Sequence, residues 1–264
     1  MVSVGQMVGL ILAIIVPMMV GIILFLHIKK KTKVKGLVFT MLYGVAGYLW
    51  EAWIYVMAYG WVGAMMMSNS WFETAFGSVV GQMLIALVYA LLTAGGLYWA
   101  IYLSNMHEIN EKRGTAVGLG FGMAYTVWNY VLIYGTPLIV SFQMRFGTFA
   151  GDSETEQKVI GLSVENMYLF IIDTVIFILI MVGTTLVMSH YFISGKKLMM
   201  FAVPLASQFL IKFLNGFLPT IMPDVASAVI YNVAMGVVAV YCLWMLFGYL
   251  KSSKVYIKPG VELK

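Results

Sequence analysis

Charged residues are scarce in this chain. Asp, Glu, Lys and Arg make up 10% of the 264 residues, against about 25% in an ordinary soluble domain. Hydrophobic residues make up 62%. A packed soluble core could not hide that much apolar surface, so lipid must solvate most of it. The shortage of charge therefore excludes a soluble globular domain and predicts an integral membrane protein.

Cysteine and catalytic signatures are also missing. The single cysteine, Cys242, excludes an intrachain disulfide. The sequence contains neither a His-Glu-x-x-His nor a Gly-x-Ser-x-Gly motif. Its three histidines, His27, His107 and His190, each fall at the end of a different apolar run. We therefore expect no metal site, no cofactor and no complete catalytic constellation.

Long apolar runs dominate what is present. A helix needs about 20 apolar residues to cross the hydrocarbon core of a bilayer. Runs of this length predict an all-α, polytopic membrane helix bundle of about seven spans, forming a single transmembrane domain over residues 1–264. The expected spans are residues 4–28, 36–59, 76–104, 114–140, 166–192, 197–218 and 225–250.

Basic residues between the runs indicate orientation. Most of the 16 Lys and Arg fall on one side of the predicted membrane, beginning with the cluster at 29–35, and the opposite loops hold only Arg145 and Lys158. Because basic loops stay in the cytoplasm, we expect the N-terminus outside and the C-terminus in the cytoplasm of a bacterial-type plasma membrane. Charge scattered in this way excludes nucleic acid as a partner. The polar residues 141–165 predict an outer loop with a short amphipathic helix.

Three Asp, Glu or Lys residues lie inside predicted spans: Glu51, Asp173 and Lys212. Each costs about 2.5–3.5 kcal/mol to insert, so each needs a partner or a function. Counting about 1.5 Å per residue places all three in the outer half of the membrane. We expect an Asp173–Lys212 ion pair with Glu51 nearby. This cluster either holds the bundle together or lines an outward-facing polar cavity that binds a ligand or peptide.

Gly114, Gly118 and Gly122 open the fourth predicted span at a spacing of four residues. This spacing puts them on one helix face, where small residues allow a second helix to approach closely. A phosphate-binding loop is excluded because no Lys-Ser/Thr follows. We therefore interpret the three glycines as a helix-packing surface.

The order of several short motifs resembles the YhfC family of predicted intramembrane metalloproteases, which are distant relatives of the CAAX-prenyl-type membrane proteases. The resemblance covers nearly the whole chain. It rests on an opening tripeptide, a first span that ends in a lysine cluster, two small-residue motifs and an acidic residue eight positions before Asp173. These are Met1-Val2-Ser3, residues 29–35, Thr93-Ala94-Gly95, Gly118-Leu119-Gly120-Phe121-Gly122 and Glu165.

The chain departs from the family at the positions where the resemblance implies metal ligands and catalytic groups. A Glu-Glu pair is expected at Tyr98 and Trp99, a His at Phe121 and a Glu at Tyr125. A His is expected at Asp173, and a His and an Asp near Gln208 and Lys212. Aromatic side chains cannot replace a ligand set with an open coordination site, and a lysine ammonium repels a divalent cation. The resemblance therefore implies a degenerate protease site.

Three functions remain open from the sequence. The first is a catalytically inactive, protease-like protein, or pseudoenzyme, that binds a membrane protein, a peptide or a small ligand in addition to the lipid bilayer. The second is an active intramembrane metallopeptidase, which would need zinc. The third is a transporter or channel component that uses Glu51, Asp173 and Lys212.

Overall fold

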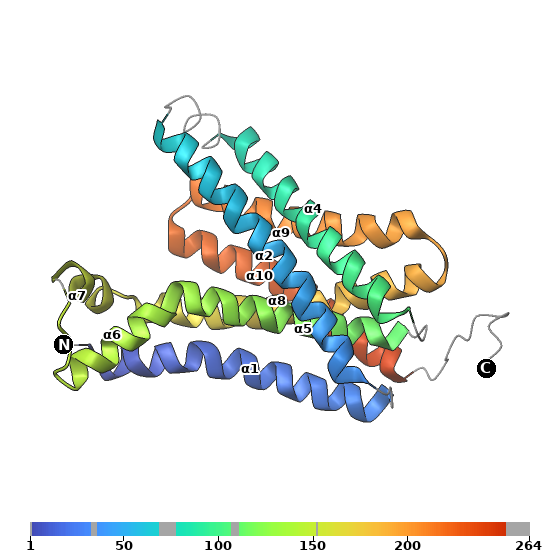
Figure 1. Cartoon of the computed structure of the whole chain (residues 1–264), viewed down its shortest axis with the longest axis horizontal. Helices are drawn as coiled ribbons and strands as arrows, with labels where there is room; N and C mark the ends of the chain where they lie inside the picture. The colour runs from blue at the N-terminus through green and yellow to red at the C-terminus, as the bar shows by residue number, and fades with distance from the viewer. Residues whose placement is uncertain (1, 33–35, 69–77, 107–110, 152, 252–264) are drawn as a thin grey trace.

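The computed structural model describes residues 2–32, 36–68, 78–106, 111–151 and 153–251 (Figure 1). All regular structure in these ranges is helical, as expected for a chain whose backbone polar groups must be satisfied inside lipid. The elements are α1 (Val4–Thr32), α2 (Leu37–Ser68), α4 (Val79–Ser104), α5 (Glu111–Tyr130), η1 (Val131–Gly135), α6 (Thr136–Arg145), α7 (Ser153–Ile160), α8 (Val164–Ile193), α9 (Lys197–Ile221) and α10 (Asp224–Lys251).

Seven helical stretches in the described ranges are long and apolar enough to cross a membrane. They cover Val4–Lys31, Leu37–Ala58, Val79–Ser104, Lys112–Arg145, Val164–Ile193, Lys197–Ile221 and Ala226–Gly248. The prediction of an all-α, polytopic membrane bundle with seven spans is therefore confirmed. The first residues of the predicted third span, 76 and 77, lie outside the described residues.

The fourth span is longer than predicted. Helix α5 continues through η1, a π-helical segment, into α6, so that helical structure extends to Arg145. Pro137 lies inside this continuous helical stretch, directly after the π-helical turn of η1, and a π-helical turn is one way in which a helix accommodates a change in its hydrogen-bond pattern. The polar segment that follows contains α7, the short helix expected there, with an exposed Glu154–Lys158 ion pair at 2.7 Å.

Helices α5 and α8 form the centre of the bundle. Helix α5 packs against α8, α2, α1 and α4, and α8 packs in addition against α10 and α9. The close α5–α8 approach depends on Gly118, because a Cβ there would overlap the carbonyl oxygen of Met181. Gly114 and Gly122 lie against α8 in the same way, at Ser189 and Ile178. The glycine surface of the sequence thus lies in the α5–α8 contact.

Helices α2 and α4 pack side by side, and α2 crosses α5 at a steep angle (Figure 1). The α2–α5 crossing lies near the lysine-rich end of the bundle, where Gly44 of α2 meets the backbone of Val117 and Gly120 of α5 meets that of Met41. Beyond this crossing the two helices diverge toward the opposite end. The divergence leaves room for the cavity described below.

Candidate functional site

A cavity of about 440 Å³ lies where α2, α4, α5, η1 and α9 meet. Two charged side chains line it, Glu51 of α2 and Lys212 of α9. Aromatic and small residues complete the wall: Tyr48, Ala52, Tyr55, Val56, Gly60, Tyr89, Tyr125, Trp128, Asn129 and Leu132. Val56 and Leu132 are 49% and 63% exposed, so the mouth lies between α2 and η1. The presence of a π-helical segment at the mouth is notable because such segments recur at functional sites.

Glu51 is the most buried charged group of the cavity, with 1% of its surface exposed. Its carboxyl group accepts a hydrogen bond from the hydroxyl of Tyr89. Its Oε2 atom finds no hydrogen-bond partner among the described residues. A buried carboxylate oxygen without a partner carries a desolvation cost, and here that oxygen belongs to a side chain of a cavity wall.

The Lys212 ammonium lies over the ring of Tyr89, with Nζ 4.0 Å from the ring centroid, and 5.4 Å from the centroid of Tyr125. It interacts electrostatically with the carboxylates of Glu51 and Asp173. The predicted direct Asp173–Lys212 ion pair is not among the contacts formed in the described part of the chain. The Lys212 side chain is directed instead toward Tyr89 of α4. The face of the Tyr89 ring and the carboxylate of Glu51, from α2, together stabilise the ammonium.

Asp173 interacts with the cavity from outside its wall. It is half-buried on α8, where it interacts electrostatically with Lys212 and with the hydroxyls of Tyr125 and Tyr231. Within the described residues it does not line the cavity. The structure therefore places Glu51 and Lys212 in one cavity, with Asp173 as a second carboxylate near the ammonium.

Aromatic stacking fixes the floor of the cavity. Tyr125 stacks on Phe177 of α8 with ring centroids 3.9 Å apart, and Tyr48 meets Tyr125 edge-on at 5.9 Å. The Asn129 side chain donates to the carbonyl of Tyr125 at 2.8 Å and to the Tyr48 hydroxyl at 3.4 Å. These contacts join α2, α5 and α8, so the rings of the wall are held in place by the bundle core.

The six positions of the degenerate protease site divide into two groups. Tyr98, Phe121 and Tyr125 pack in one hydrophobic cluster. Gln208 is fully buried, and its Nε2 lies 3.7 Å from Sδ of Met181 in that cluster. Trp99 points elsewhere, being 64% exposed on an apolar groove between α2 and α4. Asp173 joins the first group through its electrostatic interaction with Tyr125. In the part of the chain that the structure describes, no three His, Cys, Asp or Glu residues lie close enough to hold a metal ion.

Sequence reasoning missed most of the aromatic wall, although a signal for it exists. Tyr48, Glu51 and Tyr55 are spaced three and four residues apart, which places them on one face of α2. Tyr125, Trp128 and Asn129 also share one face of α5, because Trp128 and Asn129 follow Tyr125 by three and four residues. A polar group embedded in an aromatic stripe on each of two neighbouring helices indicates a shared cavity between them.

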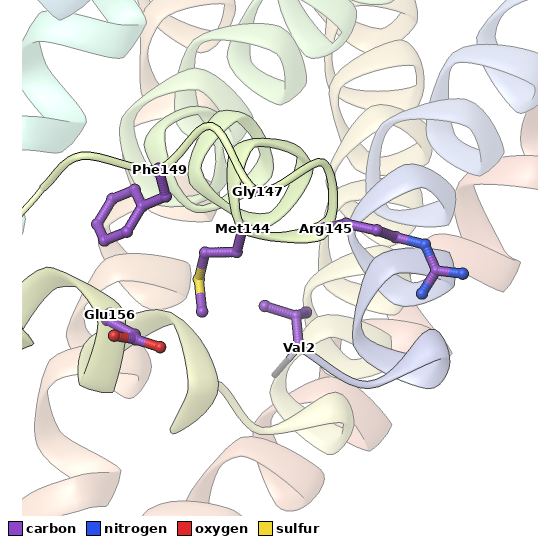
Figure 2. Close-up of a pocket in the computed structure, with 6 residues that line it drawn as sticks. All are labelled: Val2, Met144, Arg145, Gly147, Phe149 and Glu156. Carbon is purple, nitrogen blue, oxygen red and sulfur yellow. The ribbon is translucent and has the colours of Figure 1, made fainter.

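A second hollow, of about 450 Å³, lies at the end of the bundle distant from the lysine cluster. Figure 2 shows that its two charged side chains do not converge, because Arg145 points away from Glu156 with Met144 between them. Nearby, the side chain of Gln6 donates to the carbonyls of Ile160 and Leu162 at 2.7 and 2.9 Å and ties the connection between α7 and α8 to α1. We assign this hollow no chemical role.

The fold and the cavity define the class, a multi-pass membrane protein with a charged, aromatic cavity inside the bundle. Comparisons of the chain with protein-family models, with curated proteins and with solved structures give no match.

Proposed function

We propose that this chain is a non-catalytic membrane protein that binds a membrane partner, a peptide or a small ligand in the Glu51–Lys212 cavity. We further propose that its scaffold is that of the YhfC family, with the protease chemistry lost. The observation that carries the proposal is the Oε2 atom of Glu51, buried at a cavity wall without a hydrogen-bond partner among the described residues.

The cavity favours binding over a purely structural role. A charge pair that only held helices together would be packed directly against them, because a cavity beside it forfeits packing contacts. Here about 440 Å³ adjoins Glu51 and Lys212, which is within the size range of small-molecule sites. Rings that are fixed by stacking provide a preformed surface for an occupant.

The residues at the former ligand positions support a non-catalytic role. Metal-dependent hydrolysis needs a ligand set and a carboxylate that takes a proton from water. Phe121 and Tyr125 of this chain pack as aromatic core, and Trp99 is turned to the bundle surface. Gln208 offers an amide where the resemblance implies a ligand, and its Oε1 finds no hydrogen-bond partner among the described residues.

Orientation is part of the proposal. With the lysine-rich end in the cytoplasm, the cavity lies in the outer half of the membrane, because Glu51 and Lys212 both lie in the half of their spans distant from that end. An occupant would therefore reach the cavity from the outer leaflet or from the outside solution.

Cysteine labelling tests this account. In a Cys242→Ala background, Ala52→Cys places a thiol in the cavity wall, and Ala90→Cys places one at a buried alanine of α4 outside the wall. We expect a membrane-impermeant thiol reagent to modify Ala52→Cys from the outside of intact cells and to leave Ala90→Cys unmodified. Equal reaction at both positions, or reaction of Ala52→Cys only from the cytoplasmic side, would contradict an outward-facing cavity.

A further inference from the structure

The charges around the cavity do not balance. Two carboxylates, those of Glu51 and Asp173, interact electrostatically with one ammonium, that of Lys212. In the described part of the chain, these three groups are the charged side chains that interact with one another at the cavity. With all three ionised, the site carries one excess negative charge. An excess buried charge is costly unless a counter-charge accompanies it or a proton neutralises it.

Of the two carboxylates, that of Glu51 is the one that lines the cavity. This residue is 1% exposed, whereas Asp173 and Lys212 are both half-buried. The Lys212 ammonium lies over a tyrosine ring and interacts with both carboxylates, so it cannot neutralise each of them. Oε2 of Glu51 remains without a hydrogen-bond donor in the described chain. Two carboxylates therefore share one ammonium, and Glu51 is the carboxylate that adjoins the cavity.

The walls beside Glu51 suit an organic cation. Aromatic ring faces attract ammonium groups, and the attraction is largest where water is excluded. The Lys212 ammonium, 4.0 Å from the Tyr89 centroid, already uses one wall of the cavity in this way. Tyr48, Tyr55 and Trp128 line the remaining space. An inorganic divalent cation is usually held by several carboxylate and carbonyl oxygens, whereas the cavity wall offers one carboxylate and one side-chain amide among tyrosine and tryptophan rings.

We infer that the cavity binds an organic ammonium cation, which pairs with Glu51 and packs against the tyrosine and tryptophan rings. The inference rests on the proposed binding function and specifies its ligand class. The volume of about 440 Å³ accommodates a choline-sized headgroup with room for a short substituent. Because the mouth lies between α2 and η1 in a membrane span, the ammonium group belongs either to a lipid headgroup or to a free amine.

Equilibrium binding of radiolabelled choline to the full chain in phosphatidylglycerol nanodiscs tests the ligand class. We expect saturable binding that tetramethylammonium displaces. Glu51→Gln should weaken it about tenfold or more, since a charge-assisted contact is lost. Lys212→Met should tighten it, since a competing positive charge leaves the cavity. Glu154→Gln, which removes an exposed carboxylate of α7, is the matched control and should change nothing.

Other results of the binding experiment would refute the ammonium ligand, the binding function or the role of Glu51. Binding of labelled acetate that is abolished by Lys212→Met, without choline binding, would refute the cation and leave the proposed binding function standing. Absence of binding by either probe, together with an unreactive Ala52→Cys thiol, would refute both. Loss of choline binding in Glu154→Gln as well as in Glu51→Gln would show that the variants report folding and would overturn the assignment to Glu51.

The lipid composition of the nanodisc distinguishes the two sources of the ammonium group. If it is a lipid headgroup, nanodiscs that contain phosphatidylcholine should abolish binding of free choline. If it is a free amine, choline should bind equally well in the two kinds of nanodisc. Either result is compatible with the ammonium class, and the absence of choline binding in both kinds contradicts it.

Discussion

The Lys212 ammonium lies 4.0 Å from the ring centroid of Tyr89, and the hydroxyl of the same tyrosine donates to the Glu51 carboxyl. One tyrosine of α4 therefore contacts a cation of α9 with its ring and a carboxylate of α2 with its hydroxyl. This arrangement connects three spans without a direct ion pair between Lys212 and Glu51 among the contacts described. It also keeps both charges at the surface of a cavity.

Tyr89→Phe separates the two roles of this residue. The substitution keeps the ring under Lys212 and removes the hydroxyl donor to Glu51, so it should lower the free energy of unfolding by about 1–3 kcal/mol. Tyr89→Leu should cost more, since the cation–π contact is lost as well. Unfolding in mixed micelles measures both. Tyr168→Phe, at an exposed tyrosine of α8, is the control. Wild-type stability in Tyr89→Phe would show that the hydroxyl contact contributes nothing.

Lys212→Met should destabilise the bundle by roughly 2 kcal/mol, since the carboxylates of Glu51 and Asp173 lose their shared positive neighbour. Adding Glu51→Gln should recover more of this loss than adding Asp173→Asn, since Glu51 is the more buried carboxylate. A double-mutant cycle for each pair measures the difference. Recovery by Asp173→Asn alone would restore the pairing that the sequence predicted and contradict the geometry described above.

Gly118→Ala should destabilise the chain by about 1–3 kcal/mol, because the new Cβ overlaps the carbonyl oxygen of Met181 and the hydroxyl of Thr185 across the α5–α8 contact. Gly95→Ala is the matched control in α4, where an added Cβ meets nothing described within 4 Å. The control should be neutral or stabilising by up to about 1 kcal/mol, since alanine favours the helix. Similar unfolding curves for the two variants would refute the close α5–α8 approach.

The non-catalytic proposal predicts that the purified chain retains less than stoichiometric zinc and that chelators leave its thermal stability unchanged. The physical reason is that aromatic residues occupy the positions where the resemblance implies metal ligands. Elemental analysis of protein purified without a histidine tag measures the metal content. Stoichiometric zinc that is lost on substitution of Asp173 would favour the metallopeptidase alternative instead.

The seven spans could be predicted from the sequence because hydropathy reports burial in lipid directly. Counting residues along each span also placed Glu51, Asp173 and Lys212 at similar depth. Depth does not determine the direction in which a side chain leaves its helix, and for this reason the Asp173–Lys212 contact was expected in place of the Tyr89 contact. The glycine spacing indicated a close helix approach, but the identity of α8 as the partner of Gly118 required the tertiary structure.

The departures from predicted span boundaries have local causes. The fourth span was expected to end at residue 140, because polar residues begin soon afterwards, yet α6 continues to Arg145. Residues near a helix end can keep their polar groups in the interfacial region and still continue the helix. The π-helical turn of η1 leaves no mark in hydropathy, so Leu132 was not recognised as part of the cavity mouth.

Native mass spectrometry of the full chain, released gently from its own membrane, tests the central claim most directly. We expect the wild-type protein to carry one bound small molecule or lipid, which is reduced or absent in Glu51→Gln and retained in Glu154→Gln. A wild-type spectrum that matches that of Glu51→Gln, with no bound species in either, would contradict a binding role for the cavity.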